Sequence, residues 1–206
     1  MVKKRVTSKF KQTRSTNTRQ KIIDAAEHYF CQNGYYNSSV KKLAAAANVS
    51  IGSFYFYFKG KDELWIEVYR TQNERFVHTI VNSINKVEQY KKNRKSWLHE
   101  FIMDLLKTYG NSCKMRAEMK VLNYGNPKIA GQRALIKDQA MDCMMESFEH
   151  SPMMHDLKVK NPRIALSLIT DIMDSTYERI TSAAQTEDKE SIIEECCDAI
   201  YKYLLL

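Results

Sequence analysis

Apolar residues recur at intervals of three and four along most of this chain, which is the period of amphipathic α-helices. The period is clear in residues 18–33, where Ile22, Ala26 and Phe30 fall on one face. No segment alternates apolar and polar positions over the length of a strand. The pattern therefore predicts an all-α protein.

End signals divide the periodic pattern into separate helices. In Asn126-Pro127 and again in Asn161-Pro162, a capping side chain precedes a proline suited to the first helical turn. We expect a three-helix head and a six-helix body. The nine predicted helices span residues 18–33, 40–46, 50–58, 61–85, 97–109, 112–124, 127–150, 162–184 and 189–205.

Charge distinguishes the head from the body. Residues 1–70 contain 13 Lys and Arg against 5 Asp and Glu, whereas residues 71–206 contain 19 of each kind. A basic head on a neutral body is typical of a nucleic-acid-binding module joined to a regulatory or assembly module. A basic surface that only promotes solubility is the alternative, but it would not need this localisation.

The segment 1–17 is the most basic part of the chain. It has six Lys and Arg residues, no acid and little apolar content, so it cannot form a core of its own. We expect a flexible basic arm that follows phosphates or enters the minor groove of DNA. A disordered tail without a role is an equal alternative.

Composition excludes several other classes of protein. Three prolines and six glycines in 206 residues agree with a helical fold. No apolar run approaches the roughly 18 residues of a membrane span, and no apolar stretch follows the first basic residues as in a secretory signal. We therefore expect no membrane association and a cytoplasmic location.

Catalytic and metal sites are not expected either. The five histidines are scattered, and no nucleophile elbow, paired-carboxylate motif or phosphate loop accompanies them. The five cysteines form no C-x-x-C pair, so reduced, mostly buried thiols are expected, with a redox role left open. We predict a protein that is not an enzyme, with no cofactor, no metal and no catalytic residue.

Residues 49–64, VSIGSFYFYFKGKDEL, are the most informative part of the chain. Ser50 can cap a short helix, and Gly52 removes a side chain where that helix must approach something closely. Phe54 and Phe58, four residues apart, can pack inward. Together with the helix 40–46 and the linker 47–49, the segment predicts a helix-turn-helix.

This motif closely resembles that of the TetR family of bacterial transcriptional regulators. The shared pattern is valine, small polar, any residue, glycine, any residue, apolar, tyrosine, any residue, tyrosine or histidine, phenylalanine, then lysine. The resemblance is specific over residues 18–70. It implies base or groove contacts from Ile51, Gly52, Ser53, Tyr55 and Phe56, phosphate contacts from Tyr57 and Lys61, and further DNA contacts from Ser39 and Lys41.

The chemistry of these residues can be weighed one by one. Gly52 lets the backbone approach base edges, Ser53 can donate or accept a hydrogen bond there, and Ile51 can press on a thymine methyl group. Phe56 has two alternatives: contact with sugar and methyl groups, or packing back on the helix 61–85. The ring of Tyr55 can be partly buried by packing while its hydroxyl remains accessible. The first turn carries no charge, so no bidentate arginine is available there.

For the body, the resemblance implies a ligand-binding and dimerisation domain, residues 61–206, behind a DNA-binding domain, residues 18–60. In the family the last two helices form a four-helix bundle with a second subunit, and the other body helices surround an effector pocket. The apolar positions available for this core and interface are Ile164, Leu168, Ile172, Ile192, Ile200 and Leu204. The ten methionines can line an adaptable cavity or simply fill the core.

Two hypotheses for function follow. The first is a homodimeric repressor that binds a double-stranded DNA operator and is released by a small, largely apolar effector. The second is a TetR-like DNA-binding protein that acts mainly through a protein partner, without an effector. The sequence does not identify the effector, its binding residues, the operator or the regulated genes, and does not separate a repressor from an activator.

Overall fold

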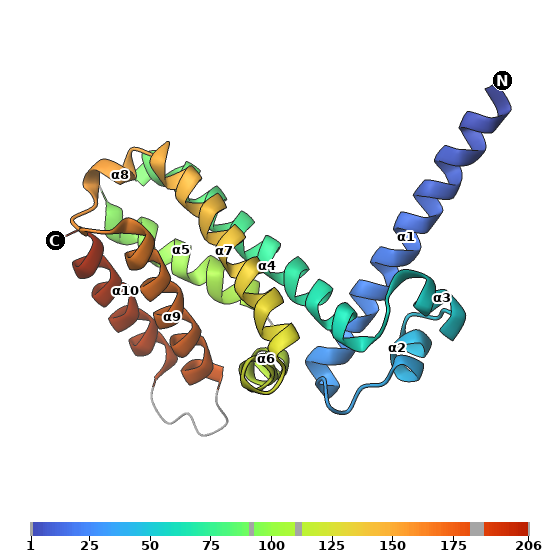
Figure 1. Ribbon diagram of the computed structural model, residues 1–206. Helices are drawn as coiled ribbons and strands as arrows, with labels where there is room; N and C mark the ends of the chain where they lie inside the picture. The colour runs from blue at the N-terminus through green and yellow to red at the C-terminus, as the bar shows by residue number, and fades with distance from the viewer. Residues whose placement is uncertain (1, 91–92, 110–112, 182–187, 206) are drawn as a thin grey trace. The chain divides into compact units, whose positions relative to one another are not determined.

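The computed structural model describes residues 2–90, 93–109, 113–181 and 188–205, and these residues form helices and loops without a strand. The elements follow one another as shown in Figure 1. They are α1 (Val2–Asn33), α2 (Val40–Ala46), α3 (Ile51–Tyr57), α4 (Lys61–Lys86), the 3₁₀ turn η1 (Val87–Tyr90), α5 (Arg94–Tyr109), α6 (Cys113–Gly125), α7 (Pro127–Glu149), α8 (Met153–Asp156), α9 (Pro162–Thr181) and α10 (Lys189–Leu205). The predicted all-α class is confirmed.

The chain forms two compact units. The first contains residues 1–71 together with 114–133, and the second contains residues 72–113 and 134–206. Helices α4 and α7 each begin in the first unit and continue into the second. The predicted division at residue 60 concerns function and stays a prediction, but packing places α6 with the head rather than with the body.

The turn between α2 and α3 is a Schellman motif. Val49 N–H donates to the Ala44 carbonyl at 3.0 Å and Asn48 N–H donates to the Ala45 carbonyl at 2.9 Å. Asn48 has a φ of 52°, a left-handed conformation that asparagine tolerates better than most residues. These bonds end α2 sharply at Ala46 and allow α3 to start at Ile51, five residues later.

Helix α1 begins at Val2, not near Thr18 as expected from the sequence. No glycine or proline lies between residues 2 and 33, and Lys, Arg and Gln favour helix, so nothing terminates a helix that extends toward the N-terminus. The backbone of residues 2–17 is therefore helical rather than the expected flexible arm. Any role of this segment on DNA stays a prediction.

Helix α6 contacts the loop that follows α1. The carboxylate of Glu118 in α6 accepts a hydrogen bond from the backbone N–H of Tyr35. Gly34, beside it, has a φ of 78°, and a Cβ at this position would overlap the Glu118 carboxylate. Gly34 is therefore required both by its backbone conformation and by the space that Glu118 occupies.

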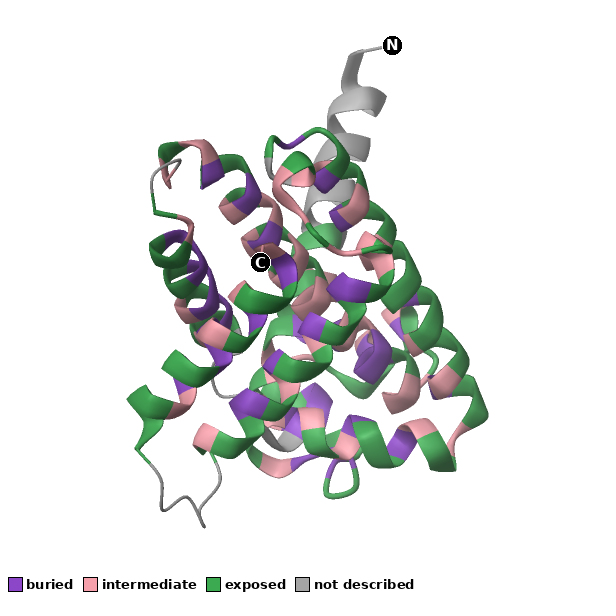
Figure 2. Cartoon of the chain, turned by 90° about the vertical axis from the view of Figure 1, so that its left-hand side faces the viewer, coloured by how far each residue is buried: buried purple, intermediate pink, exposed green. Residues whose placement is uncertain are grey.

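The second unit has one hydrophobic core. It is lined by η1, α5, α9, α10 and the parts of α4 and α7 that belong to this unit. Trp97 stacks on Phe101 with 5.5 Å between ring centroids, and its Nε1–H donates to the Ser83 carbonyl at 2.9 Å. Met144 and Met173 are buried in this core. Figure 2 shows buried positions spaced along the helices with exposed ones between them, as an amphipathic pattern requires.

The two proline start signals are confirmed. Asn126 Oδ1 accepts a hydrogen bond from the Ile129 N–H at 3.2 Å, and Asn161 Oδ1 accepts one from the Ile164 N–H at 3.1 Å. The four-residue helix α8 was not predicted, and the predicted helix end at residue 184 lies outside the described residues. Within the described chain, no helix is both long and apolar enough to cross a bilayer.

Candidate nucleic-acid interface

Helix α3 buries one face and exposes the other. Ser50 Oγ caps it by accepting the Ser53 N–H at 3.0 Å, as predicted. Phe54 and Phe58 point into the head and are fully buried, which confirms their assignment to the core. Ile51, Tyr55 and Phe56 remain exposed, with 47%, 55% and 77% of their surface accessible. The outer face of this helix is thus unusually apolar for a surface.

Gly52 lies in the first turn of α3. A Cβ built there would meet only Ser50 Oγ, at 3.9 Å, which is ordinary contact. Glycine inside a helix costs about 1 kcal/mol relative to alanine. Since no neighbour among the described residues requires the glycine, its missing side chain leaves room for something outside the chain.

Phe56 had two predicted placements, and the structure distinguishes them. Its ring does not pack back on α4 but is largely exposed, and its closest described aromatic neighbour is Tyr57, edge-on at 4.9 Å between centroids. The packing alternative is therefore wrong. A phenylalanine exposed this far is costly in water unless a partner covers it.

Ser39 and Lys41 lie at the start of α2. Ser39 Oγ accepts the Lys42 N–H at 3.3 Å, which caps the helix and leaves its own hydroxyl proton available to another acceptor. Lys41 is exposed. The ammonium of Lys42 instead donates to the Asn37 carbonyl at 2.9 Å.

Lys61 is held inside the head. Its ammonium donates to the carbonyls of Tyr35 at 3.0 Å and Ser38 at 3.3 Å, and it lies 3.9 Å from the centroid of the Tyr35 ring. The structure thus gives Lys61 a clear structural role in the α1–α2 loop, beside the phosphate contact expected from the family pattern. The exposed Lys59, two residues earlier, is the lysine that ends the family pattern, although it was not among the expected DNA contacts.

The same loop is fixed from α4 by a second residue. The hydroxyl of Tyr35 donates to Asp62 Oδ1 at 2.5 Å. Burial, together with this bond to a carboxylate, raises the pKa of Tyr35 above its ordinary value. Arg19 stacks its guanidinium on the Phe58 ring at 5.2 Å and pairs with Glu67 at 2.5 Å. These contacts link α1, α4 and the end of α3.

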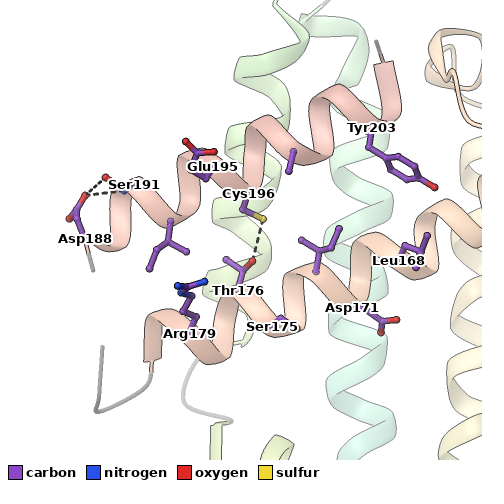
Figure 3. Close-up of a pocket in the computed structure, with 13 residues that line it drawn as sticks. Leu168, Asp171, Ser175, Thr176, Arg179, Asp188, Ser191, Glu195, Cys196 and Tyr203 are labelled. Carbon is purple, nitrogen blue, oxygen red and sulfur yellow. Dashed lines mark hydrogen bonds between the residues drawn. The ribbon is translucent and has the colours of Figure 1, made fainter. Parts of the chain in front are cut away.

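A second exposed apolar surface lies in the other unit, in an open groove of about 980 Å³ along α9 and α10. Figure 3 shows Leu168 and Asp171 projecting from α9, with Glu195 and Tyr203 projecting from α10. Ile164, Leu168 and Ile172 are exposed on α9, whereas Ile200 and Leu204 of α10 are buried in the core. The sequence assigned all five to core or interface without separating them.

The charged groups in this groove are mainly acidic. Asp171, Asp188 and Glu195 line it with a single arginine, Arg179. The Thr176 hydroxyl donates to Cys196 Sγ at 3.4 Å (Figure 3). Burial raises the pKa of the Cys196 thiol and raises that of Cys197 to about 12, so both stay protonated near neutral pH. Among the described residues, no cluster of three His, Cys, Asp or Glu residues suits a metal ion.

Comparison with known proteins agrees with the motif in the head. Residues 22–68 match the model of bacterial regulatory proteins of the tetR family. Over 65 residues, or 32% of this chain, the sequence is 35% identical to the fatty acid metabolism regulator protein of Bacillus subtilis. That alignment covers 34% of the length of the Bacillus subtilis protein. The alignment with a second relative covers 60% of the length of that second protein.

Solved structures resemble the whole chain. A candidate TetR-family regulator from Mesorhizobium loti superposes with a TM-score of 0.74 at 16% identity, over 94% of this chain and 99% of that one. The transcriptional regulator FadR from Bacillus subtilis, solved in complex with stearoyl-CoA, gives 0.69 at 21% identity, over 89% and 98%. At such identities the likeness establishes the fold, while the match at residues 22–68 identifies the motif. Residues 22–68 thus match the TetR family of bacterial regulatory proteins, and the chain has the fold of the TetR-family structures compared above.

Proposed function

We propose that this protein is a sequence-specific DNA-binding transcriptional regulator, and that it acts as a repressor in the bacterial cytoplasm, where operator DNA lies. The observation that carries the proposal is the outer face of α3. Gly52 leaves space that the fold does not use, and Phe56 beside it is 77% exposed. A surface with these two properties is suited to a close partner, and the head that carries it is basic.

Each proposed contact has a chemical role. Ile51, Gly52, Ser53, Tyr55 and Phe56 would face base edges in the major groove, because they lie on or beside the exposed side of α3. Tyr57 and Lys41 would contact phosphates, as would the Ser39 hydroxyl. Lys61 would reach a phosphate only if it gives up its bonds to the α1–α2 loop, so its main contribution would be to hold the head in shape.

We further propose a homodimer formed through the groove along α9 and α10. A two-fold dimer places two recognition helices about 34–36 Å apart, one turn of DNA, so that both half-sites are read. Exposed Ile164, Leu168 and Ile172 on α9 supply apolar area for such an interface. In a two-fold dimer these residues would be covered by the same surface patch of the second copy.

Release by a small, largely apolar effector is the proposed mode of regulation. Helix α4 starts beside the helix-turn-helix and continues into the second unit, so a ligand that shifts its later turns would change the position of the head. A coupling free energy of about 1–3 kcal/mol would release the operator about 5- to 150-fold.

The names of two relatives suggest a first effector to try. One is a fatty acid metabolism regulator, and the FadR structure holds stearoyl-CoA. The sequence match to the former lies in the head, and the latter is a likeness of fold, so neither identifies the effector here. Stearoyl-CoA is nevertheless a specific probe for an apolar ligand.

The proposal is tested by selection of DNA from a pool of random 30-base-pair duplexes with the purified protein. We expect enrichment of a two-fold symmetric sequence that binds at least about a thousandfold more tightly than random DNA. Stearoyl-CoA is then added to the complex, and fluorescence anisotropy measures release. Equal binding to selected and random duplexes would contradict sequence-specific regulation, whereas specific binding without release contradicts only this effector.

The alternative function, a DNA-binding protein that acts through a protein partner, makes a different prediction in the same experiment. It gives specific binding that no small metabolite weakens. Of the two, we favour the repressor, since the second unit of the chain is larger than a dimer interface alone requires.

A further inference from the structure

We infer that α3 reads thymine through its 5-methyl group, so that the contacted positions of each half-site are A·T pairs with thymine facing Ile51 and Phe56. The inference rests on the proposed function, in which α3 enters the major groove. It adds which feature of the bases the helix recognises.

The first argument is the set of side chains on α3. Specific contacts to guanine use the paired donors of arginine or lysine, and those to adenine use the donor and acceptor of asparagine or glutamine. Helix α3, IGSFYFY, has none of these residues. Its only polar side chains are the hydroxyls of Ser53, Tyr55 and Tyr57, each of which accepts or donates at many base edges.

The second argument is apolar surface. Ile51 and Phe56 keep 47% and 77% of their surface accessible on the side of α3 that faces away from the core. In the major groove the thymine methyl is the apolar group that a base edge presents. Contact with that methyl removes apolar area from water on both partners, whereas contact with any other base edge covers Phe56 with a polar group that loses its own hydration.

The third argument is space. Phe56 follows Gly52 by four residues and therefore lies on the same face of the helix. Helical side chains lean toward the N-terminus, so Phe56 leans toward the turn at Gly52, where a Cβ would meet no described atom closer than Ser50 Oγ at 3.9 Å. Ile51 lies about 140° around the helix from Phe56, since successive residues are about 100° apart. The two side chains would thus meet different thymines.

Replacement of thymine by uracil tests the inference, because deoxyuridine pairs like thymidine and lacks only the methyl group. The strongest duplex selected from the random pool is resynthesised with deoxyuridine at every thymidine. Each contacted methyl is worth about fourfold in affinity, so two methyls in each of two half-sites together give roughly 200-fold weaker binding.

Two variants assign the loss to its side chain. In Phe56→Ala the ratio of affinities for the thymidine and deoxyuridine duplexes should fall by at least fourfold, because one of the contacting surfaces is gone. Lys41→Ala should weaken binding to both duplexes alike and leave the ratio unchanged, as expected for a phosphate contact. Phe56 is largely exposed, and an unchanged melting temperature would confirm that the Phe56→Ala variant folds.

Three outcomes would decide the matter. Equal affinity for the two duplexes overturns the thymine inference while the proposed function stands. A selected half-site of G·C pairs alone overturns it in the same way. Failure to enrich any sequence removes the proposed function, and this inference with it.

Discussion

The outer face of α3 and the groove along α9 and α10 both expose large apolar side chains, and the two surfaces differ in charge and in shape. The outer face of α3 carries Ile51 and Phe56 in a region with 13 basic and 5 acidic residues up to residue 70. The groove along α9 and α10 carries Leu168 and Ile172 with three acidic residues and one arginine. Exposure alone indicates a partner, but the charge around it indicates which one.

The shapes of the two surfaces, like their charges, indicate different partners. The α3 face is the surface of one short helix with a glycine in it, which suits insertion into a groove of the partner. The α9–α10 surface is itself a groove, which suits side chains of a partner helix. We therefore expect nucleic acid at the first surface and a second copy of the chain at the second, and substitutions should separate the two.

The largest effect is expected from Leu168→Glu. If the groove is the dimer interface, the substitution buries two carboxylates and removes two apolar contacts, since each residue occurs twice in a two-fold interface. We expect dimerisation roughly 10²–10⁴-fold weaker, with DNA affinity lost in parallel. Sedimentation velocity at micromolar concentration measures the first effect, and fluorescence anisotropy measures the second.

Leu135→Glu is the matched control. Leu135 lies on α7 and is exposed to 48%, against 47% for Leu168, so both substitutions place a carboxylate at an equally exposed apolar position. The Leu135 variant should remain a dimer. Monomers from both variants would show that the interface extends beyond α9 and α10, and a dimer from both would remove the groove from the proposal.

Phe56→Glu should have the second largest effect, and it should weaken DNA binding without weakening dimerisation. The carboxylate would replace an apolar contact and face the phosphates, once in each half-site. We expect at least about 10²-fold weaker binding to the selected duplex with the dimer intact. A variant that keeps its affinity would show that α3 does not contact DNA through this side chain.

Most of the fold was predictable because its signals are local. Asn126-Pro127 and Asn161-Pro162 mark helix starts through a side chain that caps its own helix, and Phe54 and Phe58 follow from their spacing. The outer face of α3 was also predictable, since two core residues fix the orientation of so short a helix. The contacts of its residues with DNA stay predictions.

The remaining features depend on residues far apart in the chain. The Glu118 carboxylate accepts a hydrogen bond from the N–H of Tyr35, 83 residues away, and no local sequence pattern predicts such a bond. The same holds for Lys61, whose bonds to the α1–α2 loop cross 26 and 23 residues. The start of α1 at Val2 differs from the expectation for another reason: a basic stretch with little apolar content predicts disorder, but no glycine or proline between residues 2 and 33 ends the helix.

Lys61→Ala and Lys41→Ala compare a lysine that is hydrogen-bonded within the head with one that is exposed. Loss of the two hydrogen bonds from a charged donor should lower the free energy of unfolding by about 1–3 kcal/mol. Lys41→Ala removes an exposed lysine instead and should change stability by less than about 0.5 kcal/mol. Chemical denaturation measures both.

The two lysine variants should also differ on DNA. Lys41→Ala should weaken binding to selected and random duplexes by the same factor and reduce the dependence of affinity on salt by about one phosphate contact. If Lys61→Ala leaves stability unchanged but has this same effect on DNA, then Lys61 contacts phosphate and its bonds within the head are unimportant in solution.

The smallest effect, and the most direct test of the α3 surface, is expected from Gly52→Ala. Alanine favours helix over glycine, and its Cβ meets only Ser50 Oγ at 3.9 Å, so the free energy of unfolding should rise by up to about 1 kcal/mol. On DNA the same methyl group would hold the helix away from the bases and weaken specific binding. One substitution would thus stabilise the protein and impair its function.

Gly34→Ala is the control for Gly52→Ala, because it makes the same substitution at a glycine that the fold requires. Gly34 has a φ of 78°, and a Cβ there would displace the Glu118 carboxylate from the Tyr35 N–H, so alanine should destabilise the protein. The fold therefore needs the glycine at Gly34 and does not need the one at Gly52. If Gly52→Ala is more stable and binds the selected duplex as tightly as before, the space at Gly52 is not kept for DNA. The strongest physical support for DNA binding by the outer face of α3 would then be gone.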